Sequence, residues 1–474
     1  MQDKRSFYIN GGWTSPAQSF DAAVVNPSTE EEYAVISFAG AADVDKAMAA
    51  ARAAFVPWSQ TPPLERAALL KKLLAAYQAR ADEMAQVISA EMGAPLTMAQ
   101  DAQTASGVEN IQDAIDTLEN FNFETDMADG TILIREPVGV CALITPWNWP
   151  INQIALKVAP ALAAGCTMVL KPSEIAPLSA MLFAEIVDSA GFPPGVFNLI
   201  NGDGAGAGTF LSGHPQADMV SFTGSARAGA LVTKNAADTV KRVSLELGGK
   251  GANIIFADAH EKAAAHGAHH CFNNTGQSCN APSRMFVERP LYEKAVADAA
   301  KAAEQTAVDV AAKEGRHIGP AVSAVQYEKI RALIKSGIDQ GAKLITGGLD
   351  RPAGLDKGYF IRPTVFADVA PQMDIARQEI FGPVLAITPF DSEEEAVAMA
   401  NDTDYGLTNY VQTADKTRAR RIARQLRSGM VELNGERLCV GAPFGGYKQS
   451  GNGREGGVFG MEEFMEVKAV SGWR

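Results

Sequence analysis

Apolar residues recur with helical spacing in the first 120 residues, which we predict to be mostly helical. Leu70, Leu73, Leu74 and Tyr77 stand at positions i, i+3, i+4 and i+7. This spacing places all four side chains on one face of a helix, where they would pack on a core.

From residue 139 the spacing changes to short apolar runs that alternate with helical stretches. Strands are predicted over 139–145, 166–170, 196–200, 219–223 and 242–247. Such alternation is typical of a parallel sheet with helices on both faces. A second alternating stretch after residue 250 predicts a second α/β domain, and the tail has loose strand alternation that predicts pairing with another sheet or subunit.

Composition narrows the class of protein. A chain of 474 residues suggests two or three domains at about 150 residues each. The net charge of −13 argues against nucleic-acid or acidic-membrane partners, since both would repel this surface. Five cysteines without a CxxC pair indicate neither a disulfide framework nor a thiolate metal site, which favours a reducing compartment. With no signal peptide and no apolar stretch of 18 residues, we expect a cytoplasmic protein.

The residues just after the predicted strands carry candidate chemistry, because ligands of doubly wound sheets bind beyond the carboxyl ends of the strands. Gly224 and Ser225 open a helix directly after a strand, where free amides favour a pyrophosphate. Lys171 and Glu174 in "KPSE" form either a solvated ion pair or contacts to the hydroxyls of a ribose. A carboxylate at that place would repel a 2′-phosphate, which favours NAD over NADP.

Two residues have the character of catalytic groups. Glu246 in "RVSLELGG" alternates away from the apolar face of a strand, so burial would raise its pKa and suit it to act as a general base; a salt-bridged structural role is the alternative. Cys279 in "FNNTGQSCN" lies among small polar residues, whereas an inert cysteine is usually buried among apolar ones.

The motifs "PWNWP", "KPSE", "FTGS", "LELGGK", "FNNTGQSC", "QEIFGPV" and "PFGGYKQSG", in this order, closely resemble the NAD(P)-dependent aldehyde dehydrogenase superfamily over nearly the whole chain. The resemblance implies an α/β fold with a Rossmann-like NAD-binding domain (1–118 and 138–247), an α/β catalytic domain (248–445) and a small β oligomerisation arm (119–137 and 460–474) in a homodimer or homotetramer. Gly251 departs slightly from the family, which more often has Ser, Ala, Asp or Asn there.

By this resemblance Cys279 matches the nucleophile, Glu246 the general base and Asn148 the side-chain donor of an oxyanion hole. The matched cofactor contacts are Ile144, Thr145, Trp147, Lys171, Ser173, Glu174, Gly204, Gly208, Phe222, Gly224, Ser225, Gly248, Glu379 and Phe381. The matched wall of the aldehyde tunnel is Trp149, Gln153, Leu156, Ser278, Asn280 and Phe444. Lys157 and Glu455 match positions associated with proton handling.

The resemblance implies NAD-dependent oxidation of an aldehyde to the acid, through a thiohemiacetal and a thioester on Cys279 that water activated by Glu246 hydrolyses. The mainly apolar tunnel favours a small to medium aliphatic or aromatic aldehyde. Arg437 is the alternative signal: it would bind the carboxylate of a semialdehyde, unless it is an ordinary surface arginine. Glu246 argues against transfer of the acyl group to coenzyme A.

Other functions have weaker support in the sequence. The run "HGAHHC" places His266, His269 and His270 at zinc-ligand spacing, but no second cluster completes a ligand set, so no metal site is predicted. A Cys-His hydrolase would not need strand ends suited to a dinucleotide. A non-catalytic dinucleotide-binding protein stays open as a different class, although Cys279, Glu246 and Asn148 are all present.

Overall fold

The computed structural model describes residues 1–473, and the chain begins with strands rather than helices. These strands are β1 (Gln2–Asp3), β2 (Phe7–Ile9), β3 (Gly12–Thr14), β4 (Asp21–Asn26) and β5 (Glu31–Ser37). The prediction of mostly helical structure is therefore wrong for residues 2–37. These short strands pair with one another and, through β2, with a strand almost 200 residues away, partners that a local pattern does not reveal.

Helices follow as predicted up to residue 120. They are α1 (Ala41–Ser59), α2 (Pro63–Ala79), α3 (Ala81–Met92), α4 (Leu96–Met98), a π-helical segment (Ala99–Thr104) and α5 (Ala105–Asn120). Leu70, Leu73, Leu74 and Tyr77 on α2 are all buried in the largest core cluster, which confirms the predicted helix face.

The first large sheet has seven strands in the order β12-β11-β8-β9-β10-β2-β3. The five predicted strands are all present within one residue of their expected ends: β8 (Val140–Ile144), β9 (Thr167–Lys171), β10 (Phe197–Leu199), β11 (Met219–Thr223) and β12 (Arg242–Glu246). They run parallel, and their connections contain α6 (Pro150–Ala164), α7 (Leu178–Ala190), α8 (Thr209–Gly213) and α9 (Ala226–Ala236). The strand order reverses between β8 and β11, which is where such sheets bind ligands.

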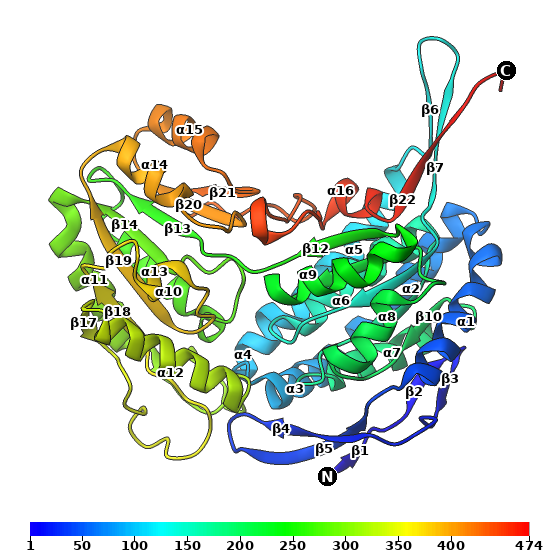
Figure 1. Cartoon of the computed structure of the whole chain (residues 1–474), viewed down its shortest axis with the longest axis horizontal. Helices are drawn as coiled ribbons and strands as arrows, with labels where there is room; N and C mark the ends of the chain where they lie inside the picture. Colours follow the sequence, from blue (N-terminus) through cyan, green and yellow to red (C-terminus); the bar gives the residue numbers. More distant parts are fainter. Residues whose placement is uncertain (474) are drawn as a thin grey trace.

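A second seven-stranded sheet, on the left in Figure 1, has the order β17-β18-β19-β14-β13-β20-β21. Its strands are β13 (Ala252–Ile255), β14 (Arg284–Glu288), β17 (Lys343–Thr346), β18 (Thr364–Ala367), β19 (Val384–Phe390), β20 (Thr408–Gln412) and β21 (Met430–Leu433). Its helices are α10 (Ala263–Phe272), α11 (Tyr292–Gln305), α12 (Ala324–Asp339), α13 (Asp374–Arg377), α14 (Glu393–Asn401) and α15 (Lys416–Gln425), with a short β15 (Ala307–Val308) and β16 (His317–Ile318) pair. The predicted α/β fold with two α/β units is confirmed.

A narrow arm projects from the body at the upper right of Figure 1. It is the three-stranded sheet β22-β7-β6, built from β6 (Glu124–Asp126), β7 (Ile132–Pro137) and β22 (Met465–Val470), and α16 (Gly457–Glu462) leads into it. Two segments far apart in the sequence thus form one hairpin-like projection.

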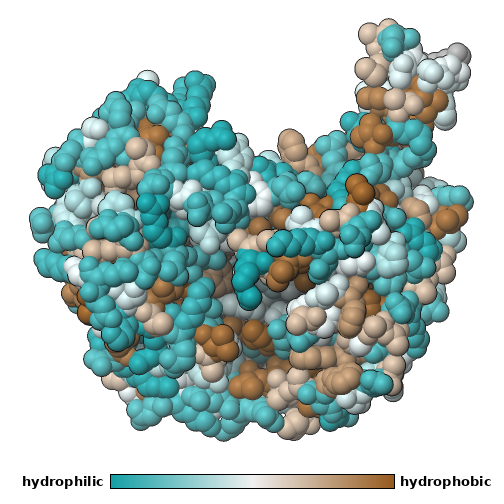
Figure 2. Space-filling view, viewed as in Figure 1, coloured by the Kyte–Doolittle hydropathy of each residue, from teal (hydrophilic) through white to brown (hydrophobic). Residues whose placement is uncertain are grey.

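The face of the molecule in Figure 2 is mostly polar, with hydrophobic residues gathered near the meeting of the two lobes and on parts of the arm. Within residues 1–473, none of the helices combines the length and the apolar character that crossing a membrane would require.

Candidate active site

A cavity of about 200 Å³ lies between the two sheets and brings most of the central predicted residues together. Nine residues predicted for the site line it: Trp147, Asn148, Gln153, Gly224, Ser225, Gly248, Cys279, Glu379 and Phe381. They come from the loop after β8, from α6, from the turn after β11, from the segment after β12 and from two loops of the second sheet. The strand ends and the cysteine loop therefore share one space.

Cys279 follows an unusual turn. Asn274 and Thr275 both have positive φ, at 51° and 59°, and Gly276 follows at 69°. Left-handed conformation is costly for a β-branched residue, so the surroundings must hold this turn in place. Thr275 Oγ1 donates to Gly319 O at 3.0 Å, and the Gln277 side-chain oxygen accepts from Val322 N at 2.9 Å. These bonds anchor the loop that presents the thiol.

Asn148 is tied to the same loop. Its side-chain Nδ2 donates to Gln277 O at 3.1 Å, and its backbone oxygen accepts from Asn274 Nδ2 at 2.9 Å and Gln103 Nε2 at 3.2 Å. One of the two N–H groups on Nδ2 is thus accounted for, in a side chain that lines the cavity with Cys279. The second N–H of Asn148 Nδ2 can therefore donate a hydrogen bond to an oxyanion that forms when the sulfur of Cys279 attacks a carbonyl group.

Glu246 ends β12 with its side chain buried and with both carboxylate oxygens lacking a hydrogen-bond partner. Burial and the nearby Glu455 raise the pKa of Glu246 well above its usual range. Gly445 packs on this carboxylate: a Cβ there would lie 2.7 Å from Glu246 Oε1, so the close approach requires glycine. Among the described residues no cation forms an ion pair with Glu246. The alternative of a salt-bridged structural role for Glu246 therefore has no support.

Lys157 and Glu455 form a buried ion pair beside Glu246, and Lys157 Nζ also donates to Ser221 Oγ at 3.1 Å. The same group of charged side chains also acts electrostatically on the Cys279 thiol. Burial raises the pKa of Cys279, and the carboxylates of Glu379, Glu246 and Glu455 raise it further. The three carboxyl groups are therefore close enough to the sulfur to act on it electrostatically, and each disfavours the thiolate.

Glu379 is held in a defined orientation. Its Oε1 accepts from Gly249 N at 2.9 Å, and a Cβ on Gly248 would lie 2.4 Å from Oε2, so the carboxylate rests directly on the glycine backbone. Phe381 meets the ring of Trp147 edge-on at 5.3 Å and closes the cavity beside it. A carboxylate with one free oxygen facing a cavity is suited to accept hydrogen bonds from sugar hydroxyls.

The remaining predicted cofactor residues lie at the carboxyl ends of neighbouring strands. Ile144 pairs with Lys171 on one side and Phe222 on the other, in the order β9-β8-β11. Lys171 Nζ is buried and donates to Gly202 O at 2.8 Å, while Glu174 lies 3.9 Å from it and is more exposed. A Cβ on Gly208 would lie 3.7 Å from Lys171 Cε, which places the glycine-rich turn at the same edge.

These residues fit a dinucleotide. Ser225 caps α9 by accepting from Ala228 N, so the first turn of the helix presents free amides next to the cavity. The buried hydroxyls of Thr145 and Thr223, on the same strand ends, have no hydrogen-bond partner among residues 1–473. A ligand with phosphates and sugar hydroxyls would satisfy these two hydroxyls, and it could also use the Glu379 oxygen that Gly249 leaves free.

A second, larger cavity of about 890 Å³ contains the other predicted substrate residues. Trp149, Leu156, Ser278, Asn280 and Phe444 line it together with Arg437 and Glu455. Trp149 Nε1 donates to Ser278 Oγ at 2.8 Å, and Tyr410 OH donates to Asn280 O at 2.7 Å. Gln153 differs from the rest of the predicted tunnel wall, since it lines the cavity of Cys279 and Glu379.

Sequence reasoning missed several residues of the site. Gln326 and Lys329 line the Cys279 cavity from α12, and their i, i+3 spacing near a helix start was the only available signal. Asn274, Gln277 and Gln103 position the cysteine loop through bonds between distant segments, for which the sequence has no local signal. Within residues 1–473 no three His, Cys, Asp or Glu side chains are grouped to hold a metal ion.

Comparison with known proteins gives the family. Residues 13–470 match the aldehyde dehydrogenase family. A 3-succinoylsemialdehyde-pyridine dehydrogenase from a Pseudomonas species is 53% identical, over 100% of this chain and 99% of that one. The chain therefore belongs to the aldehyde dehydrogenase family, and the expected resemblance is confirmed.

Solved structures of other proteins support the same family assignment. An aldehyde dehydrogenase from Bartonella henselae has 57% identity and a TM-score of 0.99, with 100% of each chain covered. A mutant of aldehyde dehydrogenase C from Pseudomonas syringae, in complex with NAD+ and octanal, has 50% identity and a TM-score of 0.98, covering 99% of this chain and 97% of that one. An NAD+ complex of an aldehyde dehydrogenase from Bacillus cereus has 38% identity and a TM-score of 0.95, covering 98% and 96%.

Proposed function

We propose that this chain oxidises a small to medium aliphatic or aromatic aldehyde to the carboxylic acid with NAD, using Cys279 as nucleophile, Asn148 as oxyanion donor and Glu246 as general base. The observation that carries the proposal is the single cavity lined by Cys279, Asn148 and Glu379, next to a buried carboxyl at Glu246 without a partner. The predicted NAD cofactor is supported by the NAD+ complexes of the relatives from P. syringae and B. cereus.

Residues of the first sheet and Glu379 would hold the cofactor. Lys171, Ser173 and Glu174 would contact the adenosine ribose; Gly224 and Ser225, at the start of α9, would receive the pyrophosphate. Glu379 would accept the hydroxyls of the nicotinamide ribose, fixed by its bond from Gly249 N. The remaining predicted contacts, Ile144, Thr145, Trp147, Gly204, Gly208, Phe222, Gly248 and Phe381, would form the walls. Bound NAD supplies the two-electron acceptor for the hydride of the aldehyde carbon.

The chain's own residues account for the remaining chemistry. The Cys279 thiol gives its proton to solvent water, and the thiolate sulfur bonds to the aldehyde carbon as the C=O π bond breaks, which places the negative charge on the oxygen. Asn148 Nδ2 and the Cys279 backbone N–H stabilise that oxyanion; one such donor contributes on the order of 3 kcal/mol. Loss of the hydride leaves a thioester on Cys279. Glu246 takes a proton from water, the hydroxide adds to the carbonyl, and the carbon–sulfur bond breaks to release the acid, while the thiolate takes the proton back from Glu246.

The substrate cavity favours an aldehyde with an apolar tail. Trp149, Leu156 and Phe444 supply apolar wall near the thiol, and the P. syringae relative binds octanal. A semialdehyde whose carboxylate binds Arg437 is the second candidate, because Arg437 lines the same cavity. Glu432 lies nearby and interacts with Arg437, which offsets part of its charge and makes a neutral tail the better match.

We further propose that the arm assembles the chain into a homodimer or homotetramer, and that the domain limits are 1–118 with 138–247, 248–445, and 119–137 with 460–474. The arm projects away from the body, and β21 pairs with β20 on one side only and forms an edge of the second sheet, so each offers backbone groups to another subunit. The cytoplasmic location stays a prediction from the number and spacing of the cysteines.

The experiment is an NAD-reduction panel with hexanal, octanal, benzaldehyde and succinic semialdehyde, run in parallel with NADP. We expect the three neutral aldehydes to give higher kcat/KM than the semialdehyde, and Cys279→Ala to abolish NADH formation while NAD still binds. NAD binding without turnover of any aldehyde by the unaltered chain would favour the non-catalytic alternative. A semialdehyde preference that Arg437→Ala removes would favour the second candidate.

A further inference from the structure

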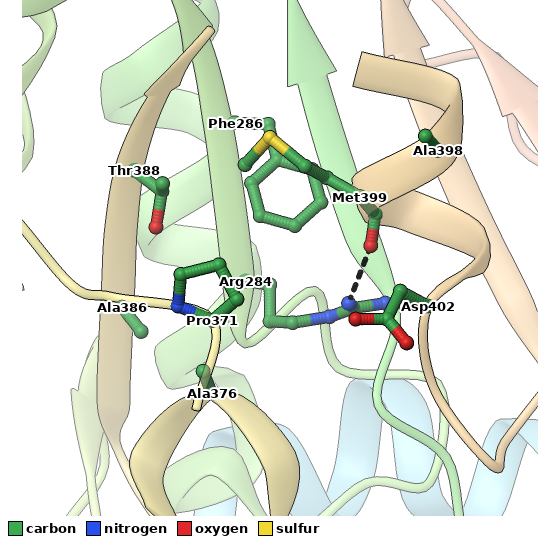
Figure 3. A pocket seen from close by; sticks show the side chains of 9 residues that line it. All are labelled: Arg284, Phe286, Pro371, Ala376, Ala386, Thr388, Ala398, Met399 and Asp402. Atoms are coloured by element: carbon green, nitrogen blue, oxygen red, sulfur yellow. Dashed lines mark hydrogen bonds between the residues drawn. The ribbon is translucent and has the colours of Figure 1, made fainter. Parts of the chain in front are cut away.

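A cavity of about 330 Å³ lies in the second sheet's domain, away from the catalytic residues. Figure 3 shows it between β14, β19, α13 and α14. Its walls are mainly apolar: Phe286, Pro371, Ala376, Ala386, Ala398 and Met399. It shares none of its lining residues with the Cys279 cavity or with the substrate cavity. Cavities of this size and apolar character are the usual sites for small organic ligands.

Two charged residues, Arg284 and Asp402, also line this cavity, and Arg284 is the buried one. Arg284 is only 4% exposed, and its guanidinium lies 5.2 Å from the centre of the Phe286 ring. Its three nitrogens donate to backbone oxygens of Lys250, Met399 and Ala400, at 2.9, 3.1 and 3.0 Å. Figure 3 marks the bond to Met399. A guanidinium has five N–H groups, so two remain beyond these three bonds.

Arg284 forms no direct ion pair among residues 1–473, although the charges of Asp402 and Arg377 act on it from nearby. Within residues 1–473 no carboxylate oxygen lies within 4.0 Å of its guanidinium, and the Asp402 carboxylate at the cavity is paired with Arg377 at 2.7 Å. Burial lowers the pKa of Arg284 to about 10, which reflects the cost of keeping this cation out of water. Buried arginines are normally paired, so this cation would gain from an anion that enters the cavity.

We propose that this cavity binds an apolar monocarboxylate, whose carboxylate accepts the free N–H groups of Arg284 and whose tail lies against Phe286, Ala386 and Met399. A single negative charge matches the single cation that lines the cavity, because Asp402 is already paired with Arg377. Medium-chain and aromatic carboxylates have this chemistry. Binding here is independent of catalysis at Cys279.

The test is calorimetric titration of the full-length chain, alkylated at Cys279, with octanoate and with 1-octanol as the uncharged probe of equal chain length. We expect octanoate to bind and octanol to bind at least tenfold more weakly. Ala398→Phe and Ala376→Phe place a ring in the cavity from α14 and from α13, and each should weaken octanoate binding at least tenfold. Ala297→Phe, at an exposed position on α11, is the matched control and should leave it unchanged.

A cooperative thermal unfolding transition in each variant shows that it is folded. Because the two filling variants lie on separate helices, the test still works if one of them fails to fold. Octanoate binding that both filling variants leave unchanged would overturn the site. Equal affinities for octanoate and octanol would overturn the role of Arg284. Because the readout is heat of binding in an alkylated enzyme, inactivity towards aldehydes would leave this result intact.

Discussion

The ammonium group of Lys157 donates a hydrogen bond to the carboxylate of Glu455, and both side chains are buried beside Glu246. The pair places opposite charges next to the proposed general base: Glu455 raises the pKa of Glu246 and Lys157 lowers it. The ionisation of Glu246 thus depends on the balance of charge between Lys157 and Glu455.

Replacing Glu455 with Gln should shift that balance. The change removes a negative charge and leaves the Lys157 cation unpaired, and both effects lower the pKa of Glu246. Only the ionised carboxylate can take a proton from water, so thioester hydrolysis rises with pH through this pKa. We expect the rise to move to lower pH by about one unit, about 1.4 kcal/mol.

The measurement is the decay of the acyl-enzyme across pH, followed by quenched-flow mass spectrometry. Glu455→Asp, which keeps the charge, is the control and should stay near the original profile. An unchanged or more alkaline profile in Glu455→Gln would show that the pair does not set the protonation of Glu246.

Glu246→Gln should stop the reaction after the oxidation step. Glutamine cannot take a proton from water, so the thioester on Cys279 accumulates after one burst of NADH. Intact-mass spectrometry with octanal should show an added acyl group, and the double variant with Cys279→Ala should show none. Sustained turnover by Glu246→Gln would remove this residue from the base role.

Asn148→Ala tests the oxyanion donor. The change removes the bond from Asn148 Nδ2 to Gln277 O, but the backbone oxygen still holds Gln103 and Asn274, and the bonds to Gly319 and Val322 still anchor the cysteine loop. We expect kcat/KM to fall by about 10² to 10³, on the order of 3 to 4 kcal/mol, with NAD affinity and melting temperature unchanged. A fall below tenfold would mean that the Cys279 backbone amide alone stabilises the oxyanion.

The sequence predicted those parts of the site whose structure depends on neighbouring residues in the chain. The two-residue period of a strand placed Glu246 on the face opposite Val243 and Leu245, and the five predicted strands of the first sheet ended within one residue of their predicted ends. The left-handed turn at Asn274 and Thr275 has no such signal, because a β-branched residue there is locally unfavourable and is held by bonds to Gly319 and Val322. Gln153 and the strands before residue 38 depend likewise on distant partners.

Glu174→Gln tests the choice between NAD and NADP. The Glu174 carboxylate lies 3.9 Å from Lys171 Nζ and is partly exposed, so its repulsion of a 2′-phosphate is partly screened. We expect kcat/KM with NADP to rise by roughly tenfold, about 1.4 kcal/mol, while NAD loses a ribose contact. Glu394→Gln, an exposed carboxylate on α14, is the control. Unchanged NADP kinetics would assign the discrimination to other residues.

Val467→Asp tests the role of the arm in assembly. Val467 lies on β22 with 62% of its surface exposed, and such an apolar side chain on a projecting strand is suited to burial against another subunit. A buried aspartate there would carry an unpaired charge, so we expect light scattering to show a smaller assembly at equal concentration. Val325→Asp, at a valine on α12 that is 82% exposed, is the matched control. If both variants keep the mass of the unaltered protein, the face of the arm that carries Val467 is not the subunit contact. Any contact that β21 makes with another subunit would then have to involve a different segment of that subunit.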